Sequence, residues 1–183
     1  LPTETSARPQ ARRLLEEAAQ RSGIDVLGWR TVPVDPSMLG GVALESLPGI
    51  EQLLFAKAPN LSSIEFERVL YLARRRAEAA YGEHGVDAYI VSMSARTVVY
   101  KGLMVAPQLR SFFPDLADPR TRSALALFHQ LFATNTLPDW KLAQPFRLVA
   151  HNGEINTLLG NRNWMTAREP ELTSPIWGDK LCD

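Results

Sequence analysis

Residues 150–169 read AHNGEINTLLGNRNWMTARE, and this stretch decides how the rest of the sequence is interpreted. It leads from a polar turn, His151-Asn152-Gly153, directly into a helix. Asn152 offers a side-chain NH₂, and Gly153 offers a backbone N–H that no Cβ obstructs. Two such donors aimed at one point stabilise the oxyanion that develops when a carbonyl is attacked. The stretch therefore indicates acyl-transfer chemistry, although an Asn-Gly pair by itself is more often a plain turn.

The composition fits a soluble globular protein with one domain, or part of one. The 183 residues are 45% hydrophobic and 22% charged, and twenty basic side chains balance twenty acidic ones. With no net charge, neither nucleic acid nor an anionic membrane is expected as a partner. Cys182 is the only cysteine, which excludes an internal disulfide and a cysteine-rich metal site. Such cysteine usage favours a reducing, cytoplasmic setting.

Hydrophobic periodicity predicts helices and strands in mixed order. One helix is expected to start near Pro9 and end before Gly23, and a capping-box pair, Ser62 and Glu65, predicts a long helix that runs to Tyr81. A third helix follows the 150–153 turn, and a brief one lies at APQLRSFF. The stretch IDVLGWRTVPV is predicted to be a strand that runs into a proline-punctuated loop. Further strands are predicted at GIEQLLFAKA, DAYIVSMSA, TVVYKGLM, SALALFHQLFAT and RLVAHNG. The absence of a regular βαβ rhythm indicates an α+β fold.

Several blocks closely resemble the glutaminase domain of the glutamate synthase large subunit, a type 2 glutamine amidotransferase. They run from Val26 to Glu169 and include IEFERVLYLARRRAE, SARTVVYKGLM, FFPDLAD, ALALFHQLFATNTLPDWKLAQPFR and the 150–169 stretch. The last two are long and contain an Asn-rich run that helix propensity would not choose, so chance does not explain them. The resemblance implies a partial four-layer αββα sandwich of the N-terminal-nucleophile hydrolase type, with residues 1–183 as a single partial domain.

The resemblance also implies which groups carry the reaction. In that family an N-terminal cysteine attacks the side-chain amide of glutamine, and its own α-amino group serves as general base. Leu1 stands first here, and the backbone nitrogen of Cys182 is acylated, so the chain as given is expected to lack its nucleophile segment as well as a C-terminal part. Asn152 and Gly153 match the oxyanion-hole pair of the family.

The segment FHQLFATNT, residues 128–136, departs from the family at the glutamine pocket. Leu131 takes a position where the family has an arginine that binds the α-carboxylate of glutamine through two parallel hydrogen bonds. Losing them should cost on the order of several kcal/mol and weaken glutamine binding by orders of magnitude. Thr134 and Asn135 match residues that line the pocket, although Thr on a strand is often there for packing alone. The isolated chain is therefore predicted to be inactive.

What the resemblance implies for function is a part in glutamate biosynthesis. Glutamine would be hydrolysed to glutamate and ammonia, and the complete enzyme would pass the ammonia to 2-oxoglutarate and reduce the resulting imine with electrons from FMN and an iron–sulfur cluster. Neither cofactor is expected within this chain. The implied partners are L-glutamine, the remainder of the large subunit and a small electron-supplying subunit. The alternative is a pseudo-glutaminase that keeps the fold as a binding or scaffold module, with Leu131 as its evidence.

The remaining polar features have ordinary explanations. His129 and His151 have no cysteine or acidic neighbours at ligand spacing, so structural hydrogen bonding is expected and no metal site is predicted. The triplet Arg74-Arg75-Arg76 is expected on a solvated helix face. Lys101, followed by Gly102 in VVYKGLM, is expected to extend its ammonium from a strand end into water.

Overall fold

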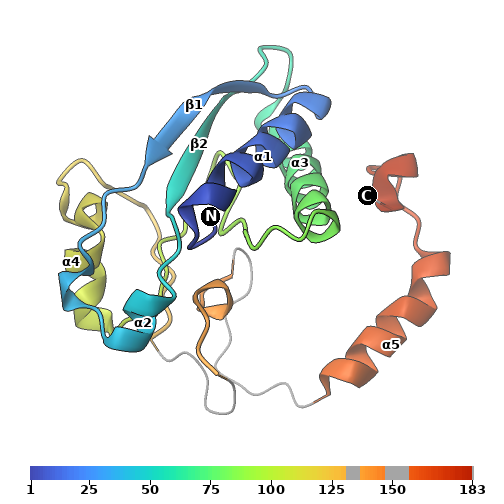
Figure 1. The fold of residues 1–183 in the computed structure, drawn as a ribbon. Helices are drawn as coiled ribbons and strands as arrows, with labels where there is room; N and C mark the ends of the chain where they lie inside the picture. The colour runs from blue at the N-terminus through green and yellow to red at the C-terminus, as the bar shows by residue number, and fades with distance from the viewer. Residues whose placement is uncertain (131–136, 147–156, 183) are drawn as a thin grey trace. The chain divides into compact units, whose positions relative to one another are not determined.

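The computed structural model describes residues 1–130, 137–146 and 157–182, and the chain divides into two units, Leu1–Ala150 and His151–Asp183 (Figure 1). The second unit consists of helix α5 (Leu158–Arg168) and two short 3₁₀ turns, Glu169–Glu171 and Gly178–Cys182. The first unit holds every other element. Over the described residues, no helix combines the length and the apolar character that crossing a bilayer requires.

Helices α1 (Arg8–Arg21) and α3 (Ser63–Glu83) pack against each other and form the main core of the first unit. Each presents one apolar face at helical spacing, and the hydroxyl of Tyr81 on α3 donates to Ala11 O on α1 at 3.1 Å. The Ser62 side chain accepts from Glu65 N while the Glu65 carboxylate accepts from Ser62 N. Both helices and the capping box predicted from the sequence are confirmed.

Strands β1 (Asp25–Thr31) and β2 (Glu51–Ala56) pair antiparallel beside α1, with Thr31 opposite Glu51 (Figure 1). The register shifts between Val26 and Gly28, where Gly28 has φ +148°, a conformation that residues with a Cβ rarely adopt. These two strands agree with the sequence prediction. They are the ladder onto which α1 packs.

A second, smaller core lies beyond the ladder. Short helices α2 (Gly41–Glu45) and α4 (Leu109–Phe112) contribute to it, as does the 3₁₀ turn Trp140–Leu142. Further 3₁₀ turns of the unit lie at Thr5–Ala7, Pro36–Met38, Ala106–Gln108 and Pro114–Ala117. The buried members of this second core are Val32, Leu39, Ala43, Phe112, Phe113 and Trp140. The 3₁₀ turn and α4 together confirm the brief helix predicted at APQLRSFF.

The strands predicted at DAYIVSMSA and TVVYKGLM are wrong, because residues 86–105 form neither strand nor helix. Side chains take the place of a ladder there: the Glu67 carboxylate accepts from Ala95 N at 2.7 Å, and Ser92 Oγ accepts from Val99 N at 3.3 Å. The strand predicted at SALALFHQLFAT is also wrong over its described part, where Leu125 and Phe128 are 83% and 84% exposed. Apolar content alone supplies no neighbouring strand. The strand predicted at RLVAHNG falls on residues 147–153, outside the described residues.

The mixture of helices with an antiparallel ladder agrees with the predicted α+β class. The described residues contain a single two-stranded sheet, whereas a four-layer sandwich requires two sheets. The predicted sandwich is therefore not seen in the described part of the chain.

Candidate functional site

The residues to which the sequence assigns chemistry lie outside the described residues. They are Leu131, Thr134, Asn135, Asn152 and Gly153, and His151, for which structural hydrogen bonding is predicted, also lies there. Their roles therefore stay predictions. The structure does describe residues 137–146, the segment that joins the predicted glutamine pocket to the predicted oxyanion corner in sequence, and this segment has a well-defined attachment to the second core.

Trp140 attaches this segment to the second core. Its side chain is 3% exposed and lies against Phe112, with 5.8 Å between ring centroids. The indole N–H donates to Ala43 O in α2 at 3.2 Å. The 3₁₀ turn Trp140–Leu142 begins after Asp139, whose carboxylate accepts from Lys141 N at 3.0 Å. A buried indole with its polar atom satisfied holds a backbone segment in one place.

Lys101 meets the same segment. Its residue is only 9% exposed, and Nζ donates to Lys141 O at 2.9 Å and to Ala143 O at 2.7 Å. The ammonium also lies 5.8 Å from the ring centroid of Tyr89 and 4.8 Å from that of Phe146. The pKa of Lys101 is lowered to about 8, chiefly by burial and in smaller part by the positive charge of Arg74, while the charge of Asp139 opposes the shift.

The expectation that Lys101 extends into water is wrong. The reason is tertiary: the carbonyls that receive its donors come from a segment 40 residues later in the chain. The local signal was a lysine inside an apolar run, VVYKGLM, followed directly by glycine. The sequence favours a packing role for tryptophans, and Trp140 has one, but nothing near it in the sequence identifies Ala43 and Phe112 as its partners.

A cavity of about 340 Å³ borders this region. Its wall includes β2 and parts of residues 89–101, with Tyr89, Ser92, Ser94 and Lys101 as polar members. The Ser94 hydroxyl donates to the Glu67 carboxylate and accepts from Thr97 N, so it stabilises a turn. The cavity is therefore a mixed polar and apolar space, and the Ser94 hydroxyl on its wall has a structural task.

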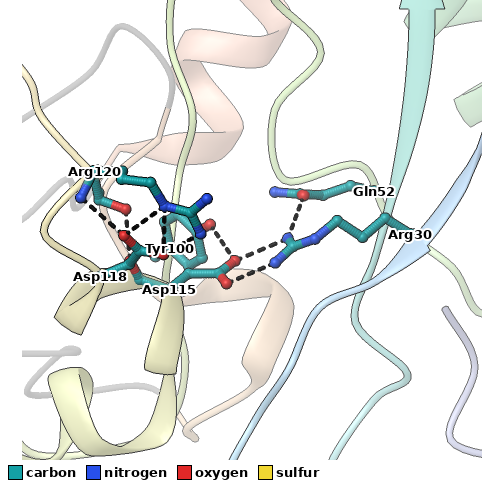
Figure 2. Close-up of polar contacts among 7 residues, drawn as sticks. Arg30, Gln52, Tyr100, Asp115, Asp118 and Arg120 are labelled. Carbon is teal, nitrogen blue, oxygen red and sulfur yellow. Dashed lines mark hydrogen bonds and ion pairs between the residues drawn. The ribbon is translucent and has the colours of Figure 1, made fainter.

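A polar network joins β1 to the 3₁₀ turn Pro114–Ala117 in the first unit, and Figure 2 shows it. Arg30 donates through both terminal nitrogens to Asp115, at 2.8 and 2.6 Å, and Tyr100 donates to the same carboxylate at 2.8 Å. Arg30 also donates to Gln52 Oε1 at 2.7 Å. The Arg30 hydrogen bonds, followed by that of Tyr100, lower the pKa of Asp115. The network therefore connects β1 and β2 to the 3₁₀ turn Pro114–Ala117.

Two polar atoms at the borders of the undescribed segments lack partners. Among the described residues, His129 Nδ1 and Gln144 Oε1 are buried without a hydrogen bond. This leaves the structural hydrogen bonding predicted for His129 unconfirmed. Within the described part of the chain, no group of three or more His, Cys, Asp or Glu side chains is arranged to hold a metal ion.

The arginine triplet is engaged with protein groups. Arg74 and Arg75 pair with Glu78 at 2.7 and 2.9 Å, and Arg76 donates to Ser22 Oγ at 3.1 Å. Arg74 and Arg76 are half-buried, whereas Arg75 is exposed. The predicted solvated face thus holds for Arg75 alone, and the other two arginines help to pack α3 against its surroundings.

Comparison with known proteins gives a consistent result. The model of the class-II glutamine amidotransferases matches residues 1–183. The chain is 44% identical to the large chain of NADPH glutamate synthase from Azospirillum brasilense, over 97% of this chain and 12% of that protein. It is 47% identical to ferredoxin-dependent glutamate synthase 2 of Synechocystis sp. over 97% of this chain and 11% of that protein. The large chain of NADPH glutamate synthase from Bacillus subtilis is 43% identical, with 95% and 12% covered.

Proposed function

This chain belongs to the class-II glutamine amidotransferases, and we propose that it serves as part of the glutaminase domain of a glutamate synthase. The observation that carries the proposal is the extent of the match: the family model covers residues 1–183, and glutamate synthases are similar over 97% of the chain. The chain spans only 11 to 12% of the length of those relatives, so the activity of the whole enzyme is part of the proposal.

The proposed reaction is hydrolysis of the glutamine side-chain amide. A cysteine thiol at the N-terminus of the complete domain adds to the amide carbonyl, and ammonia leaves as the thioester forms. Water then cleaves the thioester, which releases glutamate and restores the thiol. The task of Asn152 and Gly153 is to donate hydrogen bonds to the carbonyl oxygen while it carries negative charge. Thr134 and Asn135 are proposed to line the glutamine pocket.

Leu131 is the proposed defect of the site. A leucine side chain offers no donor to the α-carboxylate of glutamine, so that charge would be bound without a partner. The same residue supports the alternative function, a non-catalytic pseudo-glutaminase that acts as a binding or scaffold module. A domain that no longer hydrolyses glutamine would keep the fold but lose the selection for an arginine at this position.

The remaining parts of the proposed enzyme lie beyond these residues. An iron–sulfur cluster takes several cysteine thiolates, and this chain has Cys182 alone. FMN, the cluster and the reduction of the imine formed from 2-oxoglutarate and ammonia are therefore assigned to the rest of the large subunit, with a small subunit as a proposed electron supplier. The cytoplasmic setting stays a prediction.

A chimera tests the proposal. Residues 1–183 replace the matched segment of the Azospirillum large chain, once with Leu131 and once with Leu131→Arg, and ammonia release from glutamine is measured. Hydrolysis with Leu131→Arg, and a KM at least about 100-fold higher with Leu131, is expected from the loss of a charge-assisted pair. Glutamate formation from 2-oxoglutarate and added ammonium controls for intact folding of the remainder. No glutamine hydrolysis in either chimera, with that control active, would favour the pseudo-glutaminase.

A further inference from the structure

Residues 140–146 are attached to the second core from two sides. On one side the indole of Trp140 donates to Ala43 O and lies against Phe112. On the other side Lys101 donates to two backbone carbonyls, Lys141 O and Ala143 O. We call the four residues that receive this segment, Ala43, Lys101, Gly102 and Phe112, the Trp140 seat.

Gly102 completes the fit between the seat and the indole. A Cβ at this position would lie 2.4 Å from Cζ3 and 3.1 Å from Cε3 of Trp140, and 2.6 Å from the methyl carbon of Met104. The Trp140 ring therefore lies directly on the backbone at Gly102, which any larger residue prevents. Lys101 and Gly102 therefore both hold the segment 140–146: Lys101 binds two of its carbonyls, and Gly102 leaves room for the Trp140 ring.

Lys101 buries a positive charge, which packing alone would not require. Its hydrogen-bond partners among the described residues are two carbonyls, and it faces two aromatic rings. Within that part of the chain no carboxylate forms an ion pair with the ammonium, and Asp139 acts on it only through its charge. Burying an ammonium is unfavourable unless its N–H donors are satisfied. A methionine or leucine would fill the same space at lower cost, but neither would fix the positions of two carbonyls that are two residues apart.

We propose that Lys101 is a positioning residue for amide hydrolysis, which it serves by fixing the backbone of residues 140–146. The inference rests on the proposed function. Phe146 precedes Asn152 by six residues in the sequence, so a fixed backbone at residues 140–146 fixes the point from which the chain continues toward the predicted oxyanion pair. A displacement of about 1 Å in a catalytic group is enough to slow a reaction by about 100-fold.

The first test is structural and needs no activity. Hydrogen exchange is measured on the 183-residue chain and on Lys101→Met, which keeps the length of the side chain and removes its donors. Amides of residues 138–146 are expected to exchange at least tenfold faster in the variant, while those of α1 and α3 keep their rates. Lys57→Met is the matched control, since Lys57 also donates to two backbone carbonyls, Ala58 O and Leu61 O, but is exposed. If Lys101→Met does not fold, Lys101→Gln replaces it.

The second test measures the reaction in the chimera that carries Leu131→Arg. The concentration of active sites is measured by titrating the nucleophile with an electrophilic glutamine analogue. The rate is divided by that concentration, so that a smaller amount of folded enzyme does not lower the normalised kcat. Adding Lys101→Met is expected to lower normalised kcat at least tenfold with KM within about twofold, because the oxyanion contact is made in the transition state. Lys57→Met should leave both values unchanged.

Two results would overturn the inference. Unchanged exchange in residues 138–146 would mean that Lys101 does not hold the segment. An unchanged normalised kcat, even with a less stable protein, would reduce Lys101 to a packing residue. Failure of the proposed function is detected separately, because the chimera with Leu131→Arg would then show no glutamine hydrolysis even with Lys101 in place. That result would also overturn the catalytic role inferred for Lys101.

Discussion

Arg30 on β1 binds both carboxylate oxygens of Asp115, at 2.8 and 2.6 Å, and so connects positions 85 residues apart in sequence. The hydroxyl of Tyr100 adds a third donor, to Oδ2 of the same carboxylate, at 2.8 Å (Figure 2). The Asp115 side chain is 17% exposed, whereas that of Arg30 is 40% exposed. A two-pronged pair with one shielded partner is stronger than an ordinary surface pair.

Asp115→Asn is therefore expected to lower the free energy of unfolding by about 1–2 kcal/mol at pH 7. The pKa of Asp115 is lowered in the folded state, chiefly by the Arg30 hydrogen bonds, so its stabilisation is present above the usual carboxyl range. It is lost as the pH falls below about 4 and through the lowered pKa. Urea unfolding of both proteins at pH 7 and at lower pH measures this.

Asp118→Asn is the matched control for that experiment. Asp118 pairs with Arg120, whose side chain is 88% exposed, and little change in stability is expected. Equal losses of unfolding free energy in the two variants would contradict a stabilising role of the Arg30–Asp115 pair. So would a loss from Asp115→Asn that does not shrink at low pH.

Lys101 makes stability depend on pH in the opposite range. Its pKa is about 8 in the folded protein against an unfolded value near 10.5, so between these values the unfolded chain binds more protons. Stability from this group therefore rises with pH. The unfolding free energy of the parent chain, relative to Lys101→Met, should rise by on the order of 2 kcal/mol from pH 7 to 9.5.

The choice of pH 9.5 as the upper limit avoids other groups near Lys101. Burial raises the pKa of Tyr89, whose ring faces the Lys101 ammonium, above its ordinary value. Burial also raises the pKa of Tyr81 to about 12, which lowers stability only above pH 10. A difference between parent and variant that stays flat from pH 7 to 9.5 would mean that the Lys101 ammonium is not buried as described.

Local signals in the sequence predicted the local elements well. Ser62 and Glu65 marked the start of α3 because a capping box involves only backbone and side chains within four residues. The apolar face of α1 was also predictable from the sequence, because the helix itself sets the spacing of its apolar residues.

Elements that depend on distant partners were not predictable in this way. Residues 86–105 have the composition of strands, yet their N–H groups at Ala95 and Val99 bind side chains of Glu67 and Ser92. No residue near Lys101 in the sequence predicts that its ammonium will donate to Lys141 O and Ala143 O. The candidate oxyanion pair was predicted from the donors of the Asn152-Gly153 turn and from a resemblance between sequences, and both residues lie outside the described residues.

Gly102→Ala is predicted to destabilise the protein by about 1–3 kcal/mol, the usual cost of forcing extra volume into a packed site. The new Cβ would lie 2.4 Å from Trp140, so the ring or the backbone must move. Thermal unfolding measures the effect. Gly82→Ala near the end of α3, where no atom lies within 4 Å of the added Cβ, should be neutral or slightly stabilising. Similar behaviour of the two variants would argue against the close contact.

Ser62→Ala tests whether the start of α3 matters for the region around Lys101. Removing the capping hydroxyl leaves Glu65 N without its partner and should lower the free energy of unfolding by about 1 kcal/mol. Because α3 also carries Glu67 and Arg74, fraying of its first turn should reach Glu67, five residues on, before Arg74. Hydrogen exchange should therefore rise at Ala95, whose N–H binds Glu67, while residues 138–146 keep their rates. Faster exchange in residues 138–146 would show that the Trp140 seat depends on α3 and not on Lys101 alone.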